Sequence, residues 1–182
     1  MRYVALLSGI NVGKRRISMT SLADCFENYG FSGVRTYIAS GNVSFDSKLS
    51  PAIDELQNHF SNTFGFDSTI VILSLSELDE LLDRVSNTLI GQIDKWHRPL
   101  VDPKIESSRY VVAVGNGKHR IDNDAKVARV ELLESYERGS LWRWTIADGK
   151  PPASMEKLFL GKTTTRFAHT LEKIYANASG AL

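Results

Sequence analysis

The sequence predicts an α+β protein made of two linked parts. Short apolar runs rich in β-branched residues alternate with stretches whose apolar positions recur every three or four residues, and turn-forming residues separate them. The same succession of elements returns, in degraded form, in the second half. A chain of 182 residues is long enough to bury one sizeable core or two small ones.

The first six elements follow one another from residue 2 to residue 73. The predicted strands are Arg2–Leu7, Val34–Ala39, Val43–Asp46 and Ser68–Leu73. A helix with Ser18 as its N-cap and Gly30 at its end separates the first two strands. A second helix, with Ser50 as its N-cap, Pro51 in its first turn and Gly65 at its end, precedes the last strand. Strand, helix, strand, strand, helix, strand is the order of a ferredoxin-like fold.

A third helix is predicted over Ser76–Val85, and a polar connection, Asn87–Pro103, follows it. Polar connections of this kind separate compact parts of a chain. We therefore expect a ferredoxin-like part over residues 1–88 and a smaller, divergent α+β part over residues 89–182, packed on the first.

The second part gives weaker signals. A strand is predicted over Arg109–Val114. The segment Val127–Tyr136 fits a helix or a strand, and the turn residues and aromatic run that follow it favour a hairpin. A short helix over Ser154–Leu160 and a closing helix over Arg166–Ala178 complete the chain.

Two loops of the first part concentrate small, turn-forming and basic residues: Ser8–Arg16 and Ser40–Asn42. The first and second strands of the predicted topology run parallel, so both loops leave the sheet at the same edge. The first helix also begins there, with unpaired backbone N–H groups and the positive end of its dipole. We expect the two loops to be spatial neighbours.

The first loop has two interpretations, which the sequence leaves open. Its glycine-bearing turn and basic side chains are suited to hold an anion. Alternatively, Gly9 and Gly13 satisfy backbone angles that other residues avoid, and the basic side chains are simply solvated. It is not a Walker nucleotide loop, because the glycine spacing is one residue short and Arg15, rather than Ser or Thr, follows Lys14.

The leading hypothesis is a protein that binds a small anionic ligand, for example a phosphorylated one, with further contacts from a Thr-Arg motif near the C-terminus. Asn11 and Asn42 fit either ligand contacts or turn geometry, and Arg166 fits either an anion contact or a fastening of the closing helix. The candidate ligand-binding residues are Gly9, Asn11, Gly13, Lys14, Arg15, Arg16, Ser40, Gly41, Asn42, Thr164 and Arg166.

Other classes are less well supported. The net charge of +1 argues against a protein that wraps nucleic acid, and the first strand is apolar on both faces, unlike the open sheet of an RNA-binding domain. A nucleic-acid-interacting module and a non-catalytic interaction or homodimerisation domain remain the alternatives. No cofactor or metal motif, signal peptide or membrane-spanning run is present in the sequence, so we expect a cytoplasmic location and no membrane partner. The sequence names no reaction.

The residues of the two loops and their neighbours resemble the uncharacterised bacterial family catalogued as domain of unknown function 1697. The resemblance rests on Gly9–Gly13, Met19, Leu22, Gly30-Phe31, Val34–Ile38, Ser40–Val43 and, near the C-terminus, Thr163–Arg166 with Thr170. It implies two linked α+β subdomains, the first ferredoxin-like, and no established activity. The chain departs from the family pattern at Ser8, where an arginine is usual, and at Phe167–His169, where Asn-Trp-Asn is usual.

Overall fold

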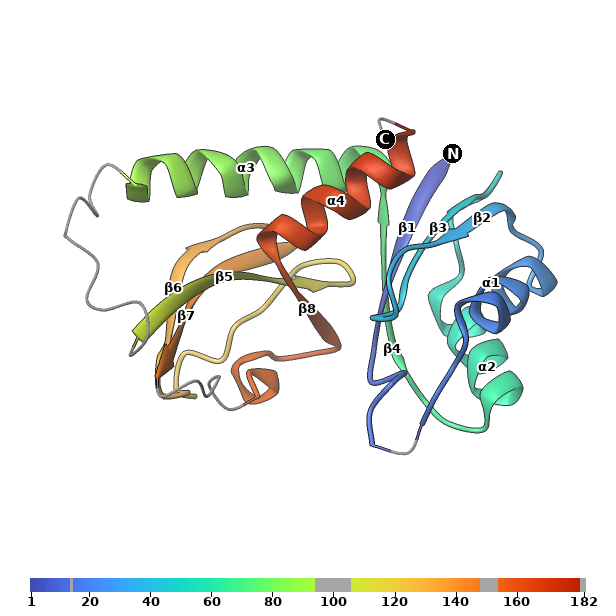
Figure 1. Cartoon of the computed structure of the whole chain (residues 1–182), viewed down its shortest axis with the longest axis horizontal. Coiled ribbons are helices and arrows are strands. Elements are labelled where there is room, and N and C mark those ends of the chain that lie inside the picture. The colour runs from blue at the N-terminus through green and yellow to red at the C-terminus, as the bar shows by residue number, and fades with distance from the viewer. Residues whose placement is uncertain (14, 94–105, 148–153, 181–182) are drawn as a thin grey trace. The chain divides into compact units, whose positions relative to one another are not determined.

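The computed structural model describes residues 1–13, 15–93, 106–147 and 154–180 (Figure 1). Within them the fold is α+β, with two four-stranded antiparallel sheets and four α-helices. The elements are β1 (Arg2–Ser8), α1 (Met19–Asn28), β2 (Ser32–Thr36), β3 (Asn42–Asp46), α2 (Ile53–Phe64), β4 (Thr69–Ser74), α3 (Leu75–Ile93), β5 (Glu106–Gly115), β6 (Val130–Ser135), β7 (Gly139–Ala147), the short 3-10 helix η1 (Glu156–Leu158), β8 (Thr163–Phe167) and α4 (Ala168–Ser179).

The first sheet has the strand order β2-β3-β1-β4, and every neighbouring pair is antiparallel. Ala5 in the central strand lies opposite Val43 of β3 and Ile72 of β4. Because β1 and β2 are both antiparallel to β3, they run in the same direction, as the sequence predicts. The loops that follow β1 and β2 therefore leave the sheet at the same end of its strands.

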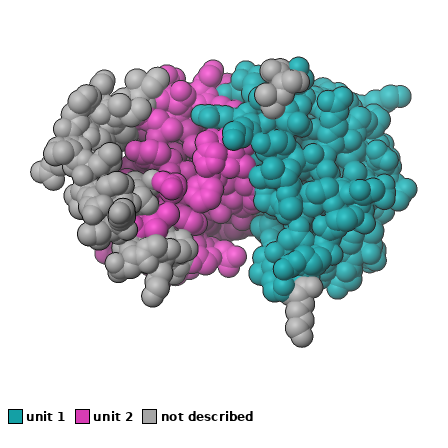
Figure 2. Space-filling view, viewed as in Figure 1, with its two compact units in different colours: residues 1–79, 172–182 teal, residues 80–171 magenta. Residues whose placement is uncertain are grey.

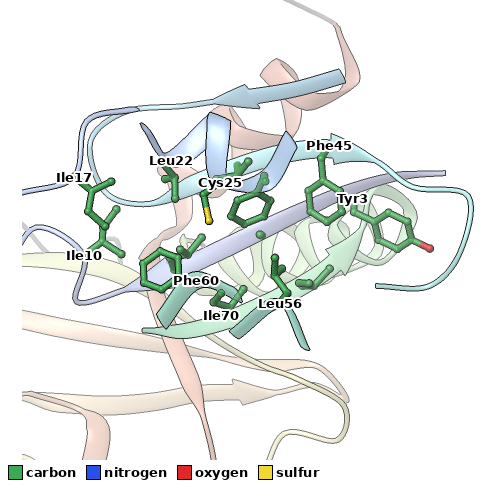
Figure 3. Packing of buried hydrophobic residues seen from close by; sticks show 14 residues of the cluster. Tyr3, Ile10, Ile17, Leu22, Cys25, Phe45, Leu56, Phe60 and Ile70 are labelled. Atoms are coloured by element: carbon green, nitrogen blue, oxygen red, sulfur yellow. The ribbon is translucent and has the colours of Figure 1, made fainter. Parts of the chain in front are cut away.

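One face of this sheet packs against α1 and α2 (Figure 1). Figure 3 shows Tyr3 of β1 beside Phe45 of β3 at one end of this cluster, with Leu22 of α1 and Phe60 of α2 towards its other end. On the other face Val4 and Leu6 are also fully buried. The prediction that β1 is covered on both faces is confirmed, and it agrees with the strand's unbroken apolar run.

Several element boundaries in this half differ from the predicted ones. Strand β2 ends at Thr36 instead of Ala39, because the chain already turns at residues 37–41. Ser18 caps α1 as predicted, with its hydroxyl accepting from Ser21 N at 2.9 Å. For α2 the N-cap is Ala52, without a side-chain cap, so the prediction of Ser50 is wrong.

The second sheet has the order β6-β7-β5-β8, which repeats the first sheet with β5 in the place of β1. All of its neighbouring pairs are antiparallel. The connections differ: α1 corresponds to the irregular segment 116–129, and the described part of the segment that corresponds to α2, residues 154–162, contains the short helix η1. The expected second, degraded copy is present in the strand arrangement, and no α-helix occurs in the described residues of these two connections.

The hairpin of β6 and β7 is confirmed, but the closing helix begins later than predicted. Residues Thr163–Phe167 form β8 and pair with β5, so Arg166 lies in a strand. Consecutive β-branched threonines favour this extended pairing over a helix. The predicted helix over Ser154–Leu160 is reduced to η1, and the predicted loop at 148–152 lies outside the described residues.

The chain divides into two compact units, coloured separately in Figure 2. Unit 1 comprises residues 1–79 and 172–182, and unit 2 comprises residues 80–171. The chain passes from one unit to the other twice, and both boundaries lie inside helices, the first in α3 and the second in α4. The predicted division at residue 88 differs from this one because α3 continues to Ile93, through a stretch whose polarity suggested a connection.

Arg2 connects the N-terminal strand of unit 1 to the C-terminal helix. Its guanidinium donates to Asp46 Oδ2 at 2.9 Å, Gly33 O at 2.8 Å, Ser44 Oγ at 3.1 Å and Ala178 O at 3.3 Å. A planar guanidinium can serve four acceptors at once because its five N–H donors diverge. This one side chain therefore links β1, β2, β3 and α4.

Replacing Arg2 with methionine is expected to lower the free energy of unfolding by about 2 kcal/mol, the scale of charge-assisted hydrogen bonds at a half-buried site. Chemical denaturation measures the change. Arg35→Met is the matched control, because Arg35 is exposed on β2 and its replacement should change stability by less than about 0.5 kcal/mol. Equal losses in the two variants would contradict this role for Arg2.

Candidate functional site

The two predicted loops meet at one end of the first sheet. We call this region the loop edge and define it as residues 9–18, 37–41 and 65–68. Ile10 and Ile17 lie side by side at this end of the hydrophobic cluster (Figure 3) and anchor the first loop in the core. Leu7 N donates to Gly41 O at 2.7 Å, which ties the end of β1 to the second loop. The predicted proximity of the loops is confirmed.

Asn11 joins the loops through its side chain. Its Nδ2 donates to Ala39 O at 2.8 Å, and its Oδ1 accepts from Ile17 N at 2.8 Å. The amide therefore spans from the second loop to the segment that leads into α1. Of the two interpretations left open by the sequence, these contacts favour turn geometry for Asn11.

The second loop is held in the same way. Asn42 is buried, and its Nδ2 donates to Tyr37 O at 3.0 Å and to Ser40 Oγ at 2.8 Å. Gly41 has φ +78°, and a Cβ at this position would lie 3.0 Å from Leu7 Cβ and Ile10 Cδ1. Only glycine fits here, because both the backbone angle and the close approach of the first loop exclude a side chain.

The cations of the loop edge are exposed but locally held. Arg16 donates twice through its NH1 group, to Gly13 O at 3.0 Å and Arg15 O at 2.6 Å. The guanidinium of Arg15 lies over the Phe66 ring, 4.5 Å from its centroid. Such a contact orients a guanidinium without neutralising it. Lys14 lies outside the described residues.

Two features of the loop edge were not found from the sequence. Phe66 follows a helix-ending glycine and gives no signal that it will meet a cation. Ile38 adopts φ +49°, a conformation that β-branched residues rarely adopt, and it is 49% exposed. Val12 in the facing loop is 64% exposed, so apolar surface accompanies the charges.

The C-terminal candidates, Thr164 and Arg166, belong to unit 2. Arg166 NH1 donates to Thr164 Oγ1 at 2.9 Å and to Thr165 O at 2.8 Å, within its own strand. Burial lowers the pKa of Arg166 to about 10, so the side chain keeps its charge at neutral pH. Thr164 and Arg166 lie together within unit 2, and the described candidate residues of the two loops lie together within unit 1.

A buried polar group in unit 2 was also not predicted. The Ser140 hydroxyl accepts from Trp142 Nε1 at 2.6 Å and lies 2.9 Å from His119 Nε2. His119 and Ser140 are both buried, and desolvation lowers the pKa of His119. The indole can only donate, and the direction of the bond between Ser140 and His119 follows from which ring nitrogen of the histidine carries the proton. The contact stabilises the start of β7 and gives no access to a substrate.

The described residues define an α+β protein with a cationic loop edge and no cluster of three His, Cys, Asp or Glu side chains suited to hold a metal. None of the described helices has both the length and the apolar character to cross a membrane. Residues 1–105 match the model of the family described as "Protein of unknown function (DUF1697)", and the chain belongs to this family. No relative is found among curated proteins.

A solved structure with a similar fold is that of the conserved bacterial protein SP0830 from Streptococcus pneumoniae. The two chains share 22% sequence identity with a TM-score of 0.61, and the match covers 98% of each. At this level of identity the similarity concerns the fold alone. It extends through both sheets of the chain, including the second half that the family model leaves unmatched.

The close approach at Gly41 leads to a stability prediction. Gly41→Ala should lower the free energy of unfolding by about 3 kcal/mol, from backbone strain and overpacking together. Gly9→Ala is the control, because Gly9 has a similar φ of +74° but open space around its Cβ position, and it should lose only about 1 kcal/mol. Denaturant titration measures both, and losses of the same size would contradict the tight contact.

Burial of His119 leads to a pH prediction. Because its pKa is lower in the folded than in the unfolded state, its contribution to stability is complete above about pH 6.5 and is lost as the pH falls below that value. The free energy of unfolding should then decrease by at most about 1.4 kcal/mol per pH unit. His119→Gln should reduce this dependence, whereas His169→Gln, at an exposed histidine of the same unit, should not. Unfolding curves between pH 8 and 5 test both expectations.

Proposed function

We propose that the loop edge of unit 1 binds a small anionic ligand, with phosphorylated compounds as the first class to test. The observation that carries the proposal is the pair of exposed guanidiniums, Arg15 and Arg16, on a loop whose shape is fixed by Asn11. A fixed loop holds cations for a ligand without the entropy cost of ordering them on binding.

The contacts of each residue suggest its role. Both bonds of Arg16 use NH1, and a guanidinium carries three further donors on Nε and NH2, which suit an oxyanion. Arg15 adds charge from its position over Phe66. Asn11 and Asn42 act as positioning residues, because their amides hold the loops together. The proposal rests on unit 1 alone and does not require Thr164 or Arg166.

Asp67 places a limit on the ligand. It lies at the loop edge next to Phe66, and its Oδ1 accepts from Ser61 Oγ at 2.6 Å. A carboxylate on the residue that follows Phe66, whose ring Arg15 contacts, reduces the positive potential that a large polyanion would encounter. The arrangement therefore favours a compact ligand with one or two negative charges over a nucleic-acid backbone.

We also infer that unit 1 has a ferredoxin-like fold. Unit 1 has the element order of a ferredoxin-like fold and the strand order β2-β3-β1-β4, with β1 between two antiparallel neighbours. These two features support the ferredoxin-like class. A bacterial, cytoplasmic protein is the setting we propose, in keeping with a single cysteine in the sequence, Cys25, which is buried in the core.

Binding can be tested by thermal shift and calorimetry with inorganic phosphate, a sugar phosphate and a nucleoside monophosphate at constant ionic strength. At least one of these should raise the unfolding temperature saturably. The double variant Arg15→Gln, Arg16→Gln should bind it at least about tenfold more weakly, as the loss of charge-assisted hydrogen bonds implies.

The matched control is Arg35→Gln with Lys48→Gln, which removes the same charge from exposed positions of the same unit outside the loop edge. This variant should bind as the wild type does. The proposal fails if none of the three compounds stabilises the wild type, or if the two double variants weaken binding equally, since the effect would then be one of net charge.

A further inference from the structure

Unit 2 contains a cavity of about 300 Å³ between the second sheet and the segments that cover it. The floor comes from β6 and β7, with Val130, Leu132 and Trp142, and Leu158 of η1 forms part of the wall. A volume of this size lies at the lower end of the range for small-molecule sites. It accommodates a single ring or a branched chain with a small polar head.

The cavity follows from the difference between the two sheets. In unit 1 the face of Ala5 and Val43 is covered by α1 and α2, whose large side chains close the core. The corresponding face of unit 2, with Ala113 opposite Ser140, is covered by segment 116–129 and the η1 region. An irregular segment presents fewer inward-pointing side chains than an amphipathic helix, so space remains above Trp142.

The cover of the cavity is held in place by backbone bonds. Asp122 N donates to Leu158 O at 2.9 Å, and Ile121 forms a β-bridge with Phe159. Asp122 Oδ1 also accepts from Asp124 N at 3.0 Å, which closes a local turn. The turn formed by Asp122, Asn123 and Asp124 therefore shapes the cavity wall.

The polar groups of the lining carry opposite charges. Asp122 supplies a carboxylate and Lys126 an ammonium group, and the Asn123 amide lies between them in the sequence. A simple anion would be repelled by Asp122 and a simple cation by Lys126. A zwitterion satisfies both groups, and its apolar part can lie against Leu132 and Trp142.

We propose that this cavity binds a small zwitterion that carries an apolar group, the chemistry of a free apolar or aromatic amino acid. Its ammonium group pairs with Asp122, its carboxylate pairs with Lys126, and its side chain occupies the space over Trp142. The site is distinct from the loop edge and shares no residue with it.

The test uses the full-length protein labelled with ¹⁵N and titrated with L-phenylalanine. Saturable shifts are expected for the Trp142 Nε1 signal and the Val127 and Val130 amides. L-Alanine lacks the ring, 3-phenylpropionate lacks the ammonium group and phenethylamine lacks the carboxylate; each should bind at least about fivefold more weakly. If no compound gives saturable shifts at these positions, or if 3-phenylpropionate or phenethylamine binds as tightly as L-phenylalanine, the proposal is overturned.

Substitutions of residues that line the cavity provide the second part of the binding test. Lys126→Gln should weaken L-phenylalanine binding about tenfold, and Asp122→Asn should do the same, because asparagine retains the turn to Asp124 and loses the charge. Lys157→Gln is the control, since Lys157 is exposed and outside the lining. Equal weakening by the control would overturn the assignment of Lys126.

Ala125→Leu should fill the cavity and abolish the shifts at an unchanged unfolding temperature. Should that variant be destabilised, Leu132→Gln and Leu160→Gln decide the question, because these leucines are 40% and 51% exposed and only Leu132 lines the cavity. Weaker binding in the first and unchanged binding in the second support the site. Unchanged binding in both overturns it.

Discussion

The candidate site depends on how the polar backbone groups at one end of the first sheet find partners. Where strands end and loops begin, N–H and C=O groups lose their sheet partners and need others if they are not solvated. Short side chains provide them: Asn11 bonds Ala39 O and the Ile17 amide, Asn42 bonds Tyr37 O, and Ser68 Oγ donates to Ser8 O at 2.8 Å. These bonds fix the loops, and the neighbouring cations acquire a defined position as a result.

The two units show how much the connections matter when the strand order is the same. Both sheets place their first strand between two antiparallel neighbours. In unit 1 the helices α1 and α2 fill the space above the sheet. The proposed site of this unit is the loop edge, at one end of the sheet. In unit 2 the described parts of the connections, residues 116–129 and 154–162, contain no α-helix, and a cavity lies above the sheet. The same strand arrangement therefore carries the two proposed sites in different places, and the covering segments decide which place it is.

The sequence predicted what depends on local periodicity and missed what depends on tertiary pairing. The proximity of the two loops followed from topology alone and is confirmed by the Asn11 bond to Ala39. The sequence predicts a helix from Arg166 because the apolar residues after it recur at helical spacing, whereas pairing with β5 makes Arg166 a strand residue. The strained backbone of Ile38 and the contact of Arg15 with Phe66 have no local signal, since both arise only when separate segments meet.

Electrostatics separates the two proposed sites. The chain has a net charge of only +1, so selectivity has to come from local groupings. At the loop edge two guanidiniums stand beside exposed apolar residues, and an anion gains from both charges at once. In the cavity the charges of one carboxylate and one ammonium group cancel, so a net charge on the ligand adds little to the binding energy. Two opposite ligand charges at the right spacing add much more. Because each proposed site disfavours the ligand class suited to the other, the two proposals can be tested independently with different ligands.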